Sequence, residues 1–221
     1  RLVHSTVKVY SELMFNVGSP FICVENGNEE LHLTSTTLTS ICSGSFTSTI
    51  PSVNLEITCD GVTKKLTTSA ARDIYIAYSK IKTAFGTQNI FNKNIQVKIY
   101  FGTDLLATLG GIYFIPKPTF TIDIQNPECF EDPANLKLTG LPTFDAGKAS
   151  LLVYVKNNGH EESFSLTSLS SDNIAFSDYI SFGITAGECQ VEAQFDDGTG
   201  VGNLCSVPAE CIIKAPDPII I

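Results

Sequence analysis

The chain has 221 residues, of which 43% are hydrophobic and 17% are charged, and its formal net charge is −9. This composition is that of a globular protein, so a disordered chain is excluded. The acidic balance repels the phosphates of nucleic acids and of anionic membranes, so neither is an expected partner, and no apolar run is long enough to cross a bilayer.

The chain contains an internal repeat at an offset of about one domain length. Four pairs of segments recur in the same order: CVEN at 23–26 with CFED at 129–132, LHLT at 31–34 with LKLT at 136–139, QVKIYF at 96–101 with QVEAQF at 190–195, and PKP at 116–118 with PDP at 216–218. We therefore expect two domains, over residues 1–116 and 117–215. Residues 216–221 are expected to be the start of a further module or a linker, and both ends of the chain look cut from a longer polypeptide.

In the first domain, alternation of apolar and polar residues predicts strands near 12–17, 30–35, 45–50, 53–59, 62–68, 95–101 and 105–115. The segment 69–85 is ambiguous. Its residues Ala70, Ile74, Ala77, Tyr78, Ile81 and Phe85 share one helical face, while Ile74, Ile76 and Tyr78 also alternate as in a strand. We expect a short helical insertion at 69–85, with a strand as the alternative. The prolines at 116 and 118 predict a short, stiff join to the second domain.

In the second domain, the same pattern predicts strands at 119–125, 134–139, 149–157, 162–168, 173–182, 187–195 and 204–214. Turn signals separate them, among them Asn157-Asn158-Gly159 and Asp196-Asp197-Gly198. Seven short strands in about 100 residues is the number in an immunoglobulin-like sandwich. The predicted fold class is therefore all-β, with tandem immunoglobulin-like β-sandwich domains.

Seven cysteines among strand-forming segments indicate an oxidising compartment. If the last two strands form a hairpin, Cys189 lies opposite Cys211, which leaves Cys129 for Cys205. In the first domain Cys42 and Cys59 form the natural pair. Cys23 is then left over, either with a partner outside the chain or as a buried free thiol.

No pattern in the sequence nominates a catalytic or cofactor-binding residue. The three histidines, His4, His32 and His160, have no paired spacing, and no serine stands in a nucleophile elbow. The acidic stretches at 131–132 and 196–198 could offer oxygen ligands to calcium, but neither has the alternating acidic spacing of a dedicated calcium loop. We expect a protein that is not an enzyme and that has no cofactor and no metal ion.

Two families resemble the second domain. Pro118-Thr119-Phe120, followed by LKLTG at 136–140, resembles the opening of IPT/TIG domains, the immunoglobulin-like modules of plexin-type receptors and bacterial surface proteins. The order of Cys129, AGECQV at 186–191, Asp197-Gly198 and Cys205 is similar to repeats in giant SprB-type adhesins of gliding bacteria. Both resemblances imply an immunoglobulin-like module of a long, exported cell-surface protein.

The expected function follows from the repeat and from these resemblances. The chain is expected to be a non-catalytic fragment of a large extracellular repeat protein, a disulfide-stapled rod or filament that mediates adhesion. Its expected partners are neighbouring modules, identical subunits, or a cell-surface or carbohydrate ligand. The alternative is a ligand- or carbohydrate-recognition ectodomain attached to a receptor or a secreted enzyme.

Overall fold

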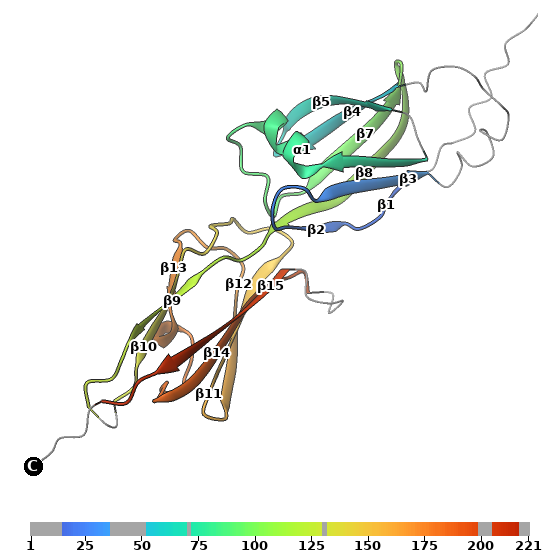
Figure 1. Ribbon diagram of the computed structural model, residues 1–221. Helices are drawn as coiled ribbons and strands as arrows, with labels where there is room; N and C mark the ends of the chain where they lie inside the picture. The colour runs from blue at the N-terminus through green and yellow to red at the C-terminus, as the bar shows by residue number, and fades with distance from the viewer. Residues whose placement is uncertain (1–14, 36–51, 70–71, 130–131, 199–204, 217–221) are drawn as a thin grey trace, which may run out of the picture. The chain divides into compact units, whose positions relative to one another are not determined.

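The computed structural model describes residues 15–35, 52–69, 72–129, 132–198 and 205–216 (Figure 1). These residues form an all-β structure that divides into two compact units. The first consists of Arg1–Pro20, Gly27–Ile90 and Asn94–Ile112, and the second of Phe21–Asn26, Phe91–Lys93 and Tyr113–Ile221. The second unit thus includes three segments of the predicted domain 1–116.

The first unit has two antiparallel sheets. A three-stranded sheet has the order β1-β3-β6, with β1 at Phe15–Val17, β3 at Glu30–Ser35 and β6 at Asp73–Ala77. The other sheet has four strands of this unit in the order β5-β4-β7-β8, with β5 at Val62–Ser69, β4 at Ser52–Cys59, β7 at Ile95–Phe101 and β8 at Asp104–Pro116. A fifth strand, β2 at Phe21–Val24, is added to this sheet beside β8. Period-two alternation buries one face of each sheet, for example Leu31 and Leu33 on β3 and Leu55 and Ile57 on β4, all at 0% exposure.

The ambiguous segment 69–85 contains both predicted elements in succession. Strand β6 occupies Asp73–Ala77, and helix α1 follows directly at Tyr78–Phe85, so the expected short helix lies in the second part of the segment and the alternative strand in the first. Ile74 and Ile76 are buried by alternation. The helix then buries Tyr78, Ile81 and Phe85, three residues that recur with a helical period.

The second unit repeats this arrangement of strands. Its three-stranded sheet has the order β13-β10-β9, with β13 at Asn173–Ala175, β10 at Asn135–Thr139 and β9 at Thr121–Gln125. Its four-stranded sheet has the order β12-β11-β14-β15, with β12 at His160–Leu166, β11 at Ser150–Asn157, β14 at Gly187–Asp196 and β15 at Cys205–Ile213. The predicted strand 173–182 ends early, because a 3₁₀ helix, η2, occupies Phe176–Asp178.

In both units the first, second and fifth of these seven strands form one sheet, and the other four strands form the second sheet. This is an immunoglobulin-like β-sandwich in which the fourth strand pairs with the third rather than with the fifth. The repeated segments occupy equivalent strands. LHLT and LKLT lie on the second strand, β3 or β10, and QVKIYF and QVEAQF lie on the sixth, β7 or β14. The core of the second unit draws on both sheets, including Leu136, Leu138, Val153 and Val191.

Segments from the predicted first domain complete the second unit. Strand β2, at Phe21–Val24, pairs in parallel with Tyr113–Pro116, the last residues of β8. Ile115 is fully buried in the core of this unit, and Phe21, Cys23 and Tyr113 pack against that core. The sequence pattern did not predict β2.

Candidate binding surface and the cysteine pairs

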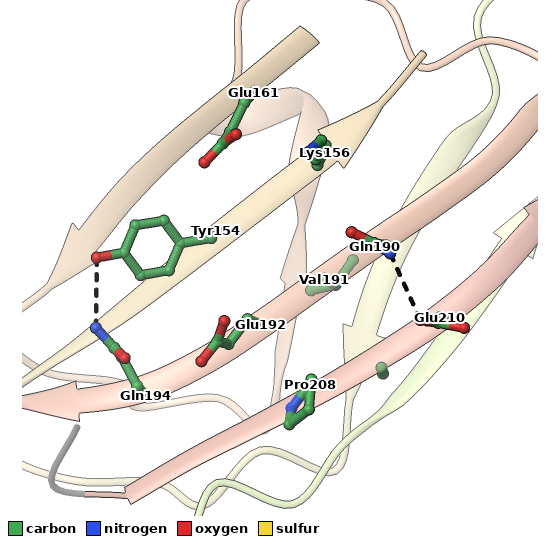
Figure 2. A pocket seen from close by; sticks show the side chains of 10 residues that line it. Tyr154, Lys156, Glu161, Gln190, Val191, Glu192, Gln194, Pro208 and Glu210 are labelled. Carbon is green, nitrogen blue, oxygen red and sulfur yellow. Dashed lines mark hydrogen bonds between the residues drawn. The ribbon is translucent and has the colours of Figure 1, made fainter. Parts of the chain in front are cut away.

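The outer face of the four-stranded sheet in the second unit carries a polar depression of about 460 Å³ (Figure 2). Alternation turns Leu151, Val153 and Val155 of β11 into the core, so Tyr154 and Lys156 point to the outer face. On β14 the same pattern places Gln190, Glu192 and Gln194 outward. Glu161 of β12 and Pro208 and Glu210 of β15 also line the depression, between which Val191 and Ala209 contribute small apolar parts. We call the eight side chains other than Val191 and Ala209 the polar face.

The strand register arranges the polar face in rows. Lys156 lies opposite Glu161 on one side and Gln190 on the other, and Gln190 lies opposite Glu210. In the next row, Tyr154 lies opposite Glu192, which lies opposite Pro208. Since directly opposed side chains in an antiparallel sheet are near neighbours, residues from four strands come together here.

A few hydrogen bonds hold this surface. Gln194, at 8% exposure, donates from Nε2 to the hydroxyl oxygen of Tyr154 at 3.4 Å. Gln190 Nε2 donates to Glu210 Oε1 at 3.5 Å, and the Ser206 hydroxyl donates to the Glu192 carboxylate. These bonds leave further amide hydrogens and carboxylate oxygens of the polar face for a ligand.

The polar face is predominantly acidic. Glu161, Glu192 and Glu210 face the single lysine Lys156. The predicted second domain is also negatively charged, since residues 117–221 contain 5 Lys/Arg and 15 Asp/Glu. Residues 1–116, in contrast, contain 9 Lys/Arg and 8 Asp/Glu. Chemically, this surface can accept hydrogen bonds from cationic groups and exchange hydrogen bonds with hydroxyl groups. Alternation marks these residues as outward-facing in the sequence, but only the register shows that they lie together.

The first unit contains a polar cluster around His32. The sequence did not predict this cluster, because the histidines have no paired spacing. On the outer face of the three-stranded sheet, Asp73 accepts hydrogen bonds from Thr34 Oγ1 at 2.7 Å and from His32 Nε2 at 3.0 Å. Both hydrogen bonds lower the pKa of the Asp73 carboxyl, and the bond from Thr34 has the larger effect. The His32 ring stacks on Tyr75 with ring centroids 4.4 Å apart. Thr34 donates to Asp73 rather than to His32, so the cluster lacks the relay of a hydrolytic triad.

Among the described residues, the other histidine and the acidic stretches do not come together in one site. His160 stacks on Phe182, and His4 lies outside the described residues. Asp196 accepts a hydrogen bond from the backbone N–H of Gly198, as in a local turn, and Glu131 is not among the described residues. Within the described part of the chain, no group of three or more His, Cys, Asp or Glu side chains could hold a metal ion. In the same part, no helix is long and apolar enough to span a membrane.

A disulfide joins Cys23 to Cys205, with Cα atoms 5.5 Å apart. The prediction that Cys23 is left over is therefore wrong, as is the pairing of Cys129 with Cys205. The reason is tertiary: β2 lies in the second unit beside the end of β8, which brings Cys23 to Cys205 across 182 residues of sequence. The internal repeat, by contrast, predicts that Cys23 belongs to the first domain.

The remaining cysteines have three different positions. Cys129 is exposed and has a free thiol. Cys189 and Cys211 lie directly opposite each other on β14 and β15, as the predicted hairpin requires, and both are free thiols. Cys59 is buried on β4, whereas Cys42 lies outside the described residues, so their pairing stays a prediction.

No family model and no curated protein matches this chain. The resemblance to IPT/TIG domains and SprB-type repeats therefore stays a prediction. Among solved structures, the chain is similar to the selenomethionine-substituted chicken interferon gamma receptor alpha chain, at 12% identity and a TM-score of 0.36. The match covers 93% of this chain and 98% of that one. The strand order of the two units is what defines the fold.

Proposed function

We propose that this chain is a non-catalytic recognition fragment of an extracellular protein, and that it binds a cationic segment of a partner through the polar face. The observation that carries the proposal is the gathering of three carboxylates, two amides and a tyrosine over one depression of a rigid sheet. Carboxylates form their strongest hydrogen bonds with the charged donors of arginine and lysine.

The extracellular assignment is supported by the disulfide between Cys23 and Cys205. Disulfides persist in oxidising environments and are rare in the cytosol. The proposal is a specific form of adhesion at a cell surface. An adhesive module needs a face that recognises its partner, and in this proposal the polar face has that role.

Recognition through a sheet face fits the four-stranded sheet of the second unit better than polymerisation through the edges of that sheet. Edge strand β15 contains Pro208, which cannot donate a backbone hydrogen bond to an added strand. The other edge strand, β12, begins with His160, Glu161 and Glu162, and charged residues on an edge oppose the addition of another chain. We therefore place ligand binding on the polar face.

The proposal is tested with the double variant E192Q/E210Q, which removes two charges from the polar face and keeps similar side-chain shapes. We expect an arginine-rich fluorescent peptide to bind the wild-type chain and to bind the variant about three- to thirty-fold more weakly, because each exposed charge pair contributes about 0.3–1 kcal/mol. Fluorescence anisotropy measures the affinity. Binding should also weaken as salt is raised.

The matched control is D123N/E128Q. It removes two negative charges from exposed positions on β9 and in the segment after it, away from the polar face. The control should bind as the wild type does. Equal losses in both variants would mean that net charge alone is responsible and would contradict the proposal. Salt-independent binding to a neutral glycan, without binding to the peptide, would favour carbohydrate recognition instead.

A further inference from the structure

Two cysteines that the disulfide does not use face each other in the last hairpin of the second unit. Cys189 on β14 and Cys211 on β15 are direct partners in the antiparallel register. Opposed residues of such a pair lie on the same face of the sheet with Cα atoms about 4.5–5.5 Å apart. This spacing falls within the range of about 4.4–6.8 Å that a disulfide spans.

Both thiols point toward the core, but they differ in exposure. Cys189 is 0% exposed, whereas Cys211 is only partly buried and packs at the margin of the same core cluster. The antiparallel register makes the two side chains direct neighbours. The sulfur atoms are therefore adjacent, and one of them can be reached from solvent.

We propose that Cys189 and Cys211 are a cross-strand redox pair that closes to an intramolecular disulfide by exchange with a small-molecule disulfide such as oxidised glutathione. The Cys211 thiolate attacks one glutathione sulfur, forms a mixed disulfide and releases the first glutathione. The Cys189 thiol then loses its proton and displaces the second glutathione. Two protein thiols are oxidised to one disulfide, and one oxidised glutathione is reduced to two molecules of glutathione.

The order of attack follows from the surroundings of each sulfur. Burial first, and the nearby Cys211 second, together raise the pKa of the Cys189 thiol to about 12. Burial also raises the pKa of the Cys211 thiol, but the hydrogen bond from Cys189 lowers it in part. Since the thiolate is the nucleophile, Cys211 reacts first.

A disulfide between Cys189 and Cys211 would fix the hairpin of β14 and β15, which carries part of the polar face. The row next to the cysteines contains Gln190 and Glu210, which are also direct partners. A disulfide at Cys189 and Cys211 therefore constrains the register of β14 and β15 at that row. This inference does not depend on what the polar face binds.

The test is a peptide map of the full chain after incubation with a glutathione redox buffer, with free thiols blocked before digestion. We expect a linked peptide containing Cys189 and Cys211 beside the one containing Cys23 and Cys205. Oxidation should raise the melting temperature by about 5 °C or more, because the link restricts the unfolded chain. Full blocking of both Cys189 and Cys211 under these oxidising conditions would overturn the proposal.

Single variants test the order of the two steps. In C189S, the mixed disulfide with glutathione should accumulate at Cys211, because no second thiol resolves it. In C211S, buried Cys189 should remain unmodified. The variant C129S is the control: Cys129 is an exposed thiol outside the pair, and its loss should leave the link between Cys189 and Cys211 unchanged. A map linking Cys129 to either cysteine would contradict the pairing.

Discussion

At the scale of single residues, a buried asparagine ties a distant segment into the second unit. Asn92 is 1% exposed, and its amide donates to the carbonyl oxygens of Ala149 at 2.9 Å and Asp145 at 3.3 Å. Its side-chain oxygen accepts a hydrogen bond from the Ala149 N–H at 2.9 Å. Its φ of 55° lies in the left-handed region, which asparagine tolerates better than most residues. Gly147 lies so close that a Cβ there would be 2.1 Å from the Asn92 carbonyl oxygen.

We expect Asn92→Ala to lower the free energy of unfolding by about 2–4 kcal/mol, because the substitution leaves the N–H and C=O groups of Ala149 buried without these partners. Urea denaturation followed by far-ultraviolet circular dichroism measures the change. Asn54→Ala is the control, since its side chain makes one exposed hydrogen bond with Thr67. A loss at Asn92 no larger than that at Asn54 would show that the segment 91–93 is not held by this side chain.

The Asp73 carboxyl gives the first unit a dependence on pH at the residue scale. Its pKa in the folded chain is lowered, so its hydrogen bonds stabilise the fold fully above the ordinary aspartate pKa of about 3.9. That contribution is lost as the pH falls through the lowered pKa of the folded state.

We therefore expect the wild-type chain to be more stable than Asp73→Asn at pH 7, and the two melting temperatures to converge as the pH falls below about 4. Thermal denaturation of both chains across this range measures the difference. The exposed residue Asp104, at the β7–β8 turn, supplies the control Asp104→Asn, which should show no such convergence. A constant difference for Asp73→Asn down to pH 2 would contradict the assignment.

At the scale of the elements, local patterns predicted most strands well. The predicted segments 30–35, 95–101 and 187–195 correspond closely to β3, β7 and β14, because alternation between a buried and an outward face is itself a property of the sequence. Two features were not resolved by the local pattern. Strand β2 is short and forms only beside the end of β8, and the change from β6 to α1 occurs where two periodicities overlap.

The polar face could be predicted only in part, because it depends on the pairing of strands that are distant in sequence. The outward direction of Tyr154, Gln190 and Glu192 follows from alternation within each strand. Their proximity follows from the order β12-β11-β14-β15, which joins strands that are not consecutive in sequence. A hairpin can be predicted from a turn, whereas the pairing of β11 with β14 depends on how the two sheets close over the core.

At the scale of the whole chain, the disulfide between Cys23 and Cys205 closes a loop across 182 residues. A link over so long a loop restricts the unfolded chain strongly, by up to about 5 kcal/mol in the chain-entropy account. It also fastens β2 to β15 within the second unit.

We expect C23A/C205A to lower the urea midpoint of the second unit substantially, through the loss of up to about 5 kcal/mol, and wild type in reducing buffer to behave similarly. Tyrosine fluorescence and circular dichroism follow the transition. Cys129→Ala is the control for removing a cysteine outside this bond. An unchanged midpoint in C23A/C205A would show that β2 is held by packing alone.

The sequence by itself determined the all-β class, the repeated order of the strands and the register that places Cys189 opposite Cys211. These properties depend on alternation, turn residues and a hairpin between neighbours, all of which are local. Only the tertiary structure decided that Cys23 bonds to Cys205, that Asn92 belongs to the second unit, and that side chains from four strands form one polar face. Each of these depends on contacts between segments distant in sequence, which are fixed by the packing of the core.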